Sequence, residues 1–153
     1  MSDLDEFRSA ILARQAEAEL AMVLGDPAPR IELWSRRDPV TLFGAGSGGC
    51  KAGWDELSRI FRWVASTFSD VSDFRFDVEV ADLSGDLAYV VGYERFNGSI
   101  AGRPVAPITV RVTHVYRRED GEWRIVHRHG DSQPVDQSPP DESASPRGTP
   151  FPS

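Results

Sequence analysis

The sequence predicts an α+β domain in which helices cover one face of a curved antiparallel sheet. Apolar residues recur at helical spacing in 3–24, 27–36 and 54–68, whereas from residue 74 they follow the two-residue period of strands. Turn signals divide this second half into four strands that follow one another as a meander. At 153 residues the chain suits one domain with a single core, which we place at 1–133.

Three helices are expected before the meander. The first, 3–24, carries an apolar stripe made of Leu4, Phe7, Ile11, Ala18 and Met22. Gly25 suits the C-cap of that helix, and Pro27 suits the first position of a second, shorter helix. A strand at 39–44 and a glycine-rich loop follow. The third helix begins at Trp54, where two acidic residues in the first turn favour the positive end of the helix dipole.

The four strands of the meander are expected at 74–83, 87–96, 107–118 and 122–131. The closing strand, "EWRIVHRHGD", carries alternate side chains that share one face unless a bulge intervenes: Trp123, Ile125, His127, His129 and Asp131. Arg124 and Arg128 then point the other way. Gly130 favours a bulge, which would change the direction of Asp131.

Composition excludes several classes of protein. A formal net charge of -7 disfavours nucleic acid as a partner, because such binding depends on neutralising phosphates. No apolar run approaches the roughly 18 residues that span a bilayer, and the acidic N-terminus does not resemble a signal peptide, so we expect a cytoplasmic protein without a membrane partner. The proline- and serine-rich segment 134–153 is expected to be a disordered tail.

Three segments together resemble the nuclear transport factor 2-like superfamily: "GDPAPRIELWSRRDPVTLFG", "GWDELSRIFRWVASTFSD" and "THVYRREDGEWRIVHRHGD". The whole chain is most similar to the small, free-standing SnoaL-like proteins of bacteria. The last segment also resembles the final hairpin of the calcium/calmodulin-dependent kinase association domain. The resemblance implies a cystatin-like fold, a cone of curved antiparallel sheet that three N-terminal helices close over a pocket.

The resemblance also implies a function, although members of this superfold differ widely in activity. We expect a pocket that binds a small, largely apolar molecule and catalyses proton transfer without a cofactor, as a cyclase, dehydratase or isomerase. The alternative is a non-catalytic module for ligand binding or dimerisation, related to the kinase association domain. A homodimer is expected through the outer sheet face, which carries Thr109, Arg111, Thr113 and Val115.

Alignment with the kinase association domain suggests that its pocket arginines are absent here. The aligned hairpins place His114 and Gly130 where two of those arginines stand, and Gly92 takes the place of a third. The same alignment makes His114 a pocket residue. That agrees with its position on the apolar face of its strand.

The candidate catalytic residues are His114, His129 and Asp131. Histidine suits proton transfer because its pKa lies near neutrality, and a neighbouring carboxylate raises its basicity. His114 is a single titratable group on an apolar face, so it must be paired or face a cavity. Each of the three also has a purely structural interpretation, as a satisfied core or strand-end residue.

A wider set is expected to bind the ligand: Trp34, Trp54, Tyr93, Glu94, Tyr116 and His127. Glu94 shares the parity of Gly92 and would act as a base if it faces the pocket. The aromatic residues would form the walls, although core packing explains any one of them equally well. A zinc site built from His127, His129 and Asp131 or His114 has acceptable ligand types, but the His-x-His pattern is weak, so we expect no metal.

Overall fold

The computed structural model describes residues 1–44, 48–134 and 139 and confirms the predicted α+β class. The helices are α1 (Asp3–Val23), α2 (Ala28–Leu33) and α3 (Trp54–Ala65). The strands are β1 (Thr41–Phe43), β2 (Lys51–Ala52), β3 (Phe68–Ser84), β4 (Leu87–Ile100), β5 (Ala106–Glu119) and β6 (Glu122–Ser132). The predicted tail at 134–153 lies outside the described residues, apart from residues 134 and 139.

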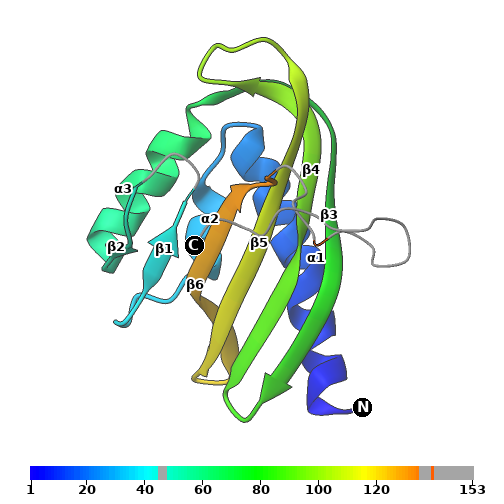
Figure 1. Cartoon of the computed structure of the whole chain (residues 1–153). Helices are drawn as coiled ribbons and strands as arrows, with labels where there is room; N and C mark the ends of the chain where they lie inside the picture. Colours follow the sequence, from blue (N-terminus) through cyan, green and yellow to red (C-terminus); the bar gives the residue numbers. More distant parts are fainter. Residues whose placement is uncertain (45–47, 135–138, 140–153) are drawn as a thin grey trace.

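The six strands form one curved sheet in the order β2-β1-β6-β5-β4-β3. Helix α1 lies across one face of this sheet, and α3 lies beside the short strands β1 and β2 (Figure 1). Strands β3 to β6 form the predicted antiparallel meander. Strand β1 pairs with β6 in parallel, and β2 extends the edge, which the sequence did not predict.

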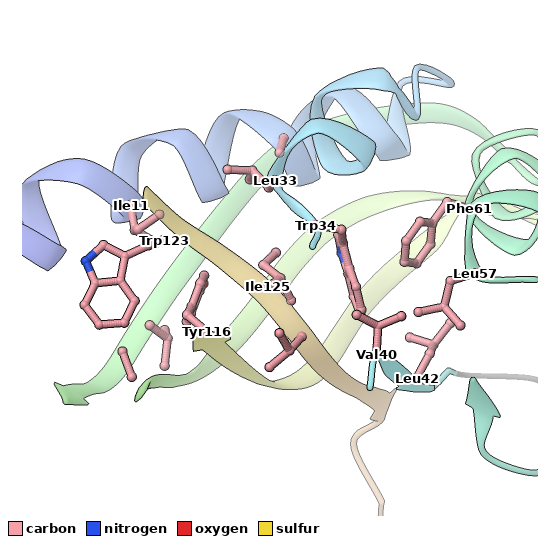
Figure 2. Packing of buried hydrophobic residues seen from close by; sticks show 14 of the residues in the cluster. Ile11, Leu33, Trp34, Val40, Leu42, Leu57, Phe61, Tyr116, Trp123 and Ile125 are labelled. Atoms are coloured by element: carbon pink, nitrogen blue, oxygen red, sulfur yellow. The ribbon is translucent and has the colours of Figure 1, made fainter. Parts of the chain in front are cut away.

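Helix α1 begins with a capping box, because the Ser2 hydroxyl and the Asp5 carboxylate each satisfy a backbone N–H of the other residue. Its buried face supplies Phe7, Ile11 and Met22 to the core. The core fills the space between the sheet and the helices, with Trp34, Phe61 and Ile125 fully buried (Figure 2). In the described part of the chain, no helix is long and apolar enough to cross a membrane.

A β-bulge at Val126 reverses the faces of the closing strand. Val115 pairs with His127, but the next residue, Tyr116, pairs with Ile125, so Val126 is the extra residue. Ile125 therefore points into the core, whereas His127 points to the outer face, although a regular strand would place both on one side. The predicted shared face of the closing strand was wrong for this reason.

The bulge expected at Gly130 is absent, because the pairs Val112–Gly130 and Arg111–Asp131 continue the regular register. Downstream of Val126, Arg128 and Gly130 face the interior, and His129 and Asp131 face outward. Because of the extra residue Val126, the concave side of the sheet carries the guanidinium of Arg128 instead of the imidazoles of His127 and His129.

Candidate functional site

A set of buried polar side chains meets on the concave face of the sheet, and we call it the polar cluster. It comprises Gln15 and Glu19 from α1, Arg30 from α2, Glu94 from β4, His114 and Tyr116 from β5, and Arg128 from β6. Each is 7% exposed or less. Charged groups are seldom buried unless they are paired, so the contacts inside the cluster decide what it does.

Arg128 lies at the centre of the polar cluster. Its two terminal nitrogens donate to the two carboxylate oxygens of Glu94 at 2.8 and 2.9 Å. The same Nη1 lies 3.1 Å from His114 Nε2 and 3.5 Å from Glu19 Oε2. One guanidinium therefore links side chains from α1, β4 and β5, and the bidentate geometry fixes its plane.

Gly130 provides the space in which the Arg128 side chain lies. A Cβ atom at residue 130 would stand 3.0 Å from Nη2 and 3.3 Å from Cζ of that guanidinium. These separations are shorter than most Cβ contacts, so a larger residue would require the guanidinium to shift by a few tenths of an ångström. The glycine has ordinary backbone angles, and we therefore attribute its role to this close approach rather than to chain flexibility.

Glu19 is the stronger acid of the two buried carboxyl groups. It accepts from Gln15 Nε2 at 2.9 Å, from Arg30 Nε at 3.2 Å and from Arg30 Nη2. Burial alone would raise the pKa of Glu19, but the guanidiniums of Arg30 and Arg128 overcome that effect and lower it to about 2. Tyr116 completes this side of the cluster by donating its hydroxyl to Gln15 Oε1 at 2.7 Å.

Glu94 is the weaker acid of the two buried carboxyl groups. Burial raises the pKa of Glu94, the nearby negative charge of Glu19 raises it further, and Arg128 opposes both effects. Two carboxyl groups whose surroundings separate their pKa values commonly divide into a permanent anion and a proton acceptor. By this criterion Glu94 is the candidate base and Glu19 the fixed charge.

His114 is neutral, and its hydrogen bonds determine its tautomer. Burial lowers the pKa of His114 well below its usual value, and the positive charge of Arg128 lowers it further. A guanidinium can only donate, so Nε2 of His114 must accept from Arg128 and the ring proton must reside on Nδ1. Nδ1 is buried and has no hydrogen-bond partner in the described part of the structure. A buried donor without a partner lowers the stability of the folded state by about 1–3 kcal/mol.

Apolar side chains surround the polar cluster on the concave face. Phe76 and Val110 are the sheet partners of Glu94 on either side, and the Phe76 ring centroid is 6.3 Å from that of His114. Phe76 and Val110 are both only half-buried, although they face the same way as the fully buried Val112. The concave face therefore joins a compact set of charges to partly exposed apolar surface.

The structure places His129 and Asp131 on the opposite face of the sheet from His114. His129 Nε2 lies 3.2 Å from Asp131 Oδ2, so the predicted contact between these two residues is present. Asp131 is also bound bidentately by Arg111 at 2.7 and 2.9 Å, which holds the pKa of that carboxyl below its usual range. Both residues line a hollow of about 270 Å³ on the outer face, together with Tyr93.

The predicted ligand-binding residues are divided among three places. Glu94 and Tyr116 belong to the polar cluster. Trp34 is buried in the core at 5.0 Å from the Phe61 ring, and Trp54 lies 6.5 Å from the same ring with the Arg36 guanidinium over it.

The other two, Tyr93 and His127, lie on the outer face of the sheet. The Arg95 guanidinium carbon lies 4.3 Å from the centroid of the Tyr93 ring. Nδ1 of His127 forms a hydrogen bond of 2.7 Å with Thr41 Oγ1.

Among the described residues, Glu19, Glu94 and His114 are the one group of metal-ligand type that comes together, with their ligand atoms within 4.8 Å of one another. Arg128 Nη1 already lies within 2.8–3.5 Å of all three. The guanidinium therefore supplies the positive charge that a cation would otherwise bring, and the set does not suit a metal. The trio of His127, His129 and Asp131 is not such a group.

Sequence reasoning missed Gln15, Glu19, Arg30 and Arg128. Gln15 and Glu19 carried a usable signal, because they are polar residues four apart that continue the apolar stripe between Ile11 and Met22. No sequence signal indicated Arg128, because the side of the sheet on which its side chain lies depends on the bulge at Val126.

The sequence matches the SnoaL-like domain family over residues 25–136, and the protein belongs to that family. No curated protein matches the chain.

Solved structures agree on the fold. A Streptomyces avermitilis protein, named as a candidate dehydratase of the nuclear transport factor 2-like family, has 20% identity and a TM-score of 0.70, covering 86% of this chain and 99% of its own. A ketosteroid isomerase-like protein from Erwinia carotovora atroseptica has 21% identity and a TM-score of 0.70, covering 84% and 97%. A Xanthomonas campestris protein, named as a candidate calcium/calmodulin-dependent kinase association domain, has 21% identity and a TM-score of 0.58, covering 82% and 90%. Each identity is low enough that the similarity shows the fold alone.

Proposed function

We propose that this protein binds a small, largely apolar carbonyl compound on the concave face of its sheet and moves a proton on it without a cofactor. The observation that carries the proposal is the unpaired Nδ1–H of the buried, neutral His114. A ligand carbonyl oxygen would give this donor the partner that it lacks. The half-buried apolar residues Phe76 and Val110 would cover the rest of such a ligand.

The chemistry assigns different roles to Glu94 and His114. Glu94 would take a proton from the carbon next to the carbonyl group, and the electron pair of that C–H bond would move to the oxygen. The Nδ1–H of His114 would stabilise the negative charge that develops there, as a preorganised donor in a water-poor site does. Return of the proton from Glu94 to another carbon completes an isomerisation. In a dehydration, protonated Glu94 would instead give that proton to the β-hydroxyl group, which leaves as water when the carbonyl group re-forms and the C–O bond breaks.

Arg128 would hold both groups in place without reacting, because it contacts Glu94 and His114 at once. The names of the structural neighbours, a dehydratase candidate and a ketosteroid isomerase-like protein, agree with this class of reaction. His129 and Asp131, which were predicted as catalytic partners of His114, take no part in the proposal because they lie on the other face of the sheet.

Thermal stabilisation by a library of polyketide-like and steroid-like ketones tests the proposal, since a bound ligand raises the melting temperature by mass action. We expect stabilisation of the wild type, a strongly reduced effect for His114→Phe, and an unchanged effect for the outer-face control His129→Phe. The phenyl ring keeps most of the volume of the imidazole and removes the donor. Equal stabilisation of the wild type and His114→Phe, or loss of the effect in His129→Phe, would contradict the proposal.

A homodimer through the outer sheet face is a second proposal, supported by exposed apolar residues on that face. Val80, Leu87 and Tyr89 are 44%, 54% and 42% exposed on neighbouring strands. Soluble proteins usually cover such a patch. Light scattering at micromolar concentration should give twice the mass of the chain, and Tyr89→Glu should reduce it to the monomer mass. A monomeric wild type would refute this proposal.

A further inference from the structure

The polar cluster is balanced in charge. It contains two carboxylates, Glu19 and Glu94, and two guanidiniums, Arg30 and Arg128. His114 is neutral, and burial raises the pKa of the Tyr116 hydroxyl, which is therefore neutral as well. With Glu94 ionised by its bidentate bond to Arg128, the formal charges sum to zero.

We propose that Glu19 sets the specificity of this site for uncharged ligands, so that a neutral ketone binds and a carboxylate of the same shape does not. This inference rests on the proposed ligand site but concerns a residue of helix α1 that takes no part in the proton transfer. Glu19 acts through its neighbours, by occupying the positive groups that an anion would otherwise use.

The contacts of Glu19 explain why it can have this effect. Its two oxygens bind Arg30, and Oε2 also lies 3.5 Å from Arg128 Nη1. The remaining positive charge of Arg128 is paired with Glu94. A ligand carboxylate would therefore enter a site where every guanidinium is already paired with an acid. At low effective dielectric, it would also be repelled by both glutamates.

Substitution of Glu19 by Gln changes this balance with little change in shape. The amide oxygen can still accept one hydrogen bond, but the cluster acquires a net charge of one positive unit. Arg30 and Arg128 then share a charge with no partner, which is the condition under which a bound carboxylate gains charge-assisted hydrogen bonds.

Acetophenone and benzoate are a suitable pair of probes, because they differ mainly in a methyl group against an anionic oxygen. We expect the wild type to bind acetophenone and to bind benzoate at least about tenfold more weakly. Glu19→Gln should bind benzoate about tenfold or more tightly than the wild type does, as expected for one new hydrogen bond to a charged group. The matched control is Glu17→Gln, an exposed glutamate on the same helix, which should behave as the wild type.

A double variant separates charge from structural damage. Glu19→Gln with Arg30→Gln restores a net charge of zero and should lose the gain in benzoate affinity. A gain in affinity followed by its loss cannot result from a role of Glu19 in stability alone.

If the wild type binds benzoate as tightly as acetophenone, the inference is overturned without any variant. If the wild type binds acetophenone but Glu19→Gln gains no benzoate affinity, the specificity role fails and the proposed function stands. If acetophenone and the ketone library all fail to bind while Glu19→Gln gains benzoate affinity, the proposed function and the preference for ketones both fail, and only the exclusion of anions by Glu19 stands.

Discussion

Arg128→Met should destabilise the protein far more than removal of a comparable arginine on the outer face. Arg128 and Glu94 are 7% and 3% exposed and share two hydrogen bonds of 2.8 and 2.9 Å. Removal of one partner of a buried ion pair leaves an uncompensated charge and typically costs about 3–5 kcal/mol. Methionine fills most of the volume of the arginine side chain. The loss of stability therefore results from the unpaired charge of Glu94 rather than from a cavity.

Urea denaturation at pH 7 measures this loss, and Arg111→Met is the matched control. Arg111 also binds a carboxylate bidentately from a neighbouring strand, but its side chain is 47% exposed. In Arg111→Met, water can solvate the carboxylate that has lost its partner. The decrease in the free energy of unfolding should therefore be much smaller than for Arg128→Met. The double variant Arg128→Met with Glu94→Met should be more stable than Arg128→Met, because it removes the unpaired carboxylate.

The pH dependence gives a further check on Arg128→Met. Without the guanidinium, the folded-state pKa of Glu94 lies further above its unfolded value of about 4.5. A raised pKa contributes stability at low pH that is lost as the pH rises through the folded value. The deficit of Arg128→Met should therefore shrink as the pH falls from 8 to 5. A loss equal to that of Arg111→Met, or a deficit independent of pH, would refute the buried-pair reasoning.

Two other predictions concern the same cluster. The folded-state pKa of His114 lies well below 6.5, so its contribution to stability is present above pH 6.5 and is lost as the pH falls below that value. The free energy of unfolding should then decrease by up to about 1.4 kcal/mol per pH unit, and His114→Phe should lack this component in urea denaturation at several pH values. Gly130→Ala should displace the Arg128 guanidinium and cost about 1–3 kcal/mol, as overpacking does. Gly44→Ala is the control, because its added Cβ meets nothing closer than 3.9 Å, and equal losses for the two would show that Gly130 makes no special space.

The helices and the meander could be predicted from the sequence because the apolar residues in each recur at a regular spacing. The stripe through Phe7, Ile11 and Met22 predicted α1, and the alternation after residue 74 predicted the strands. Element ends were less predictable: α2 stops at Leu33, and β3 begins at Phe68, well before the alternation. The parallel pairing of β1 with β6 joins residues 86 positions apart, and no local pattern encodes it.

The candidate site was predictable only in part. His114 and Glu94 were found because regular alternation holds on β4 and β5, and both reach the concave face. Arg128 was assigned to the wrong side because one inserted residue, Val126, reverses the parity of everything after it. "RIVHR" contains no glycine or proline that would indicate a bulge. The same shift brings the Arg128 guanidinium to the concave face, opposite His114 of β5.

The most direct test of the proposed function is nitrogen NMR of the three histidines, recorded at pH 7 before and after addition of a ketone that stabilises the protein. We predict that His114 is neutral with its proton on Nδ1, and that the ligand shifts this Nδ1 signal while the signals of His129 stay unchanged. Sequence-specific assignment through His114→Phe identifies the signal. A proton on Nε2 of His114, or ligand-induced shifts confined to His129 on the outer face, would refute the proposed role of His114.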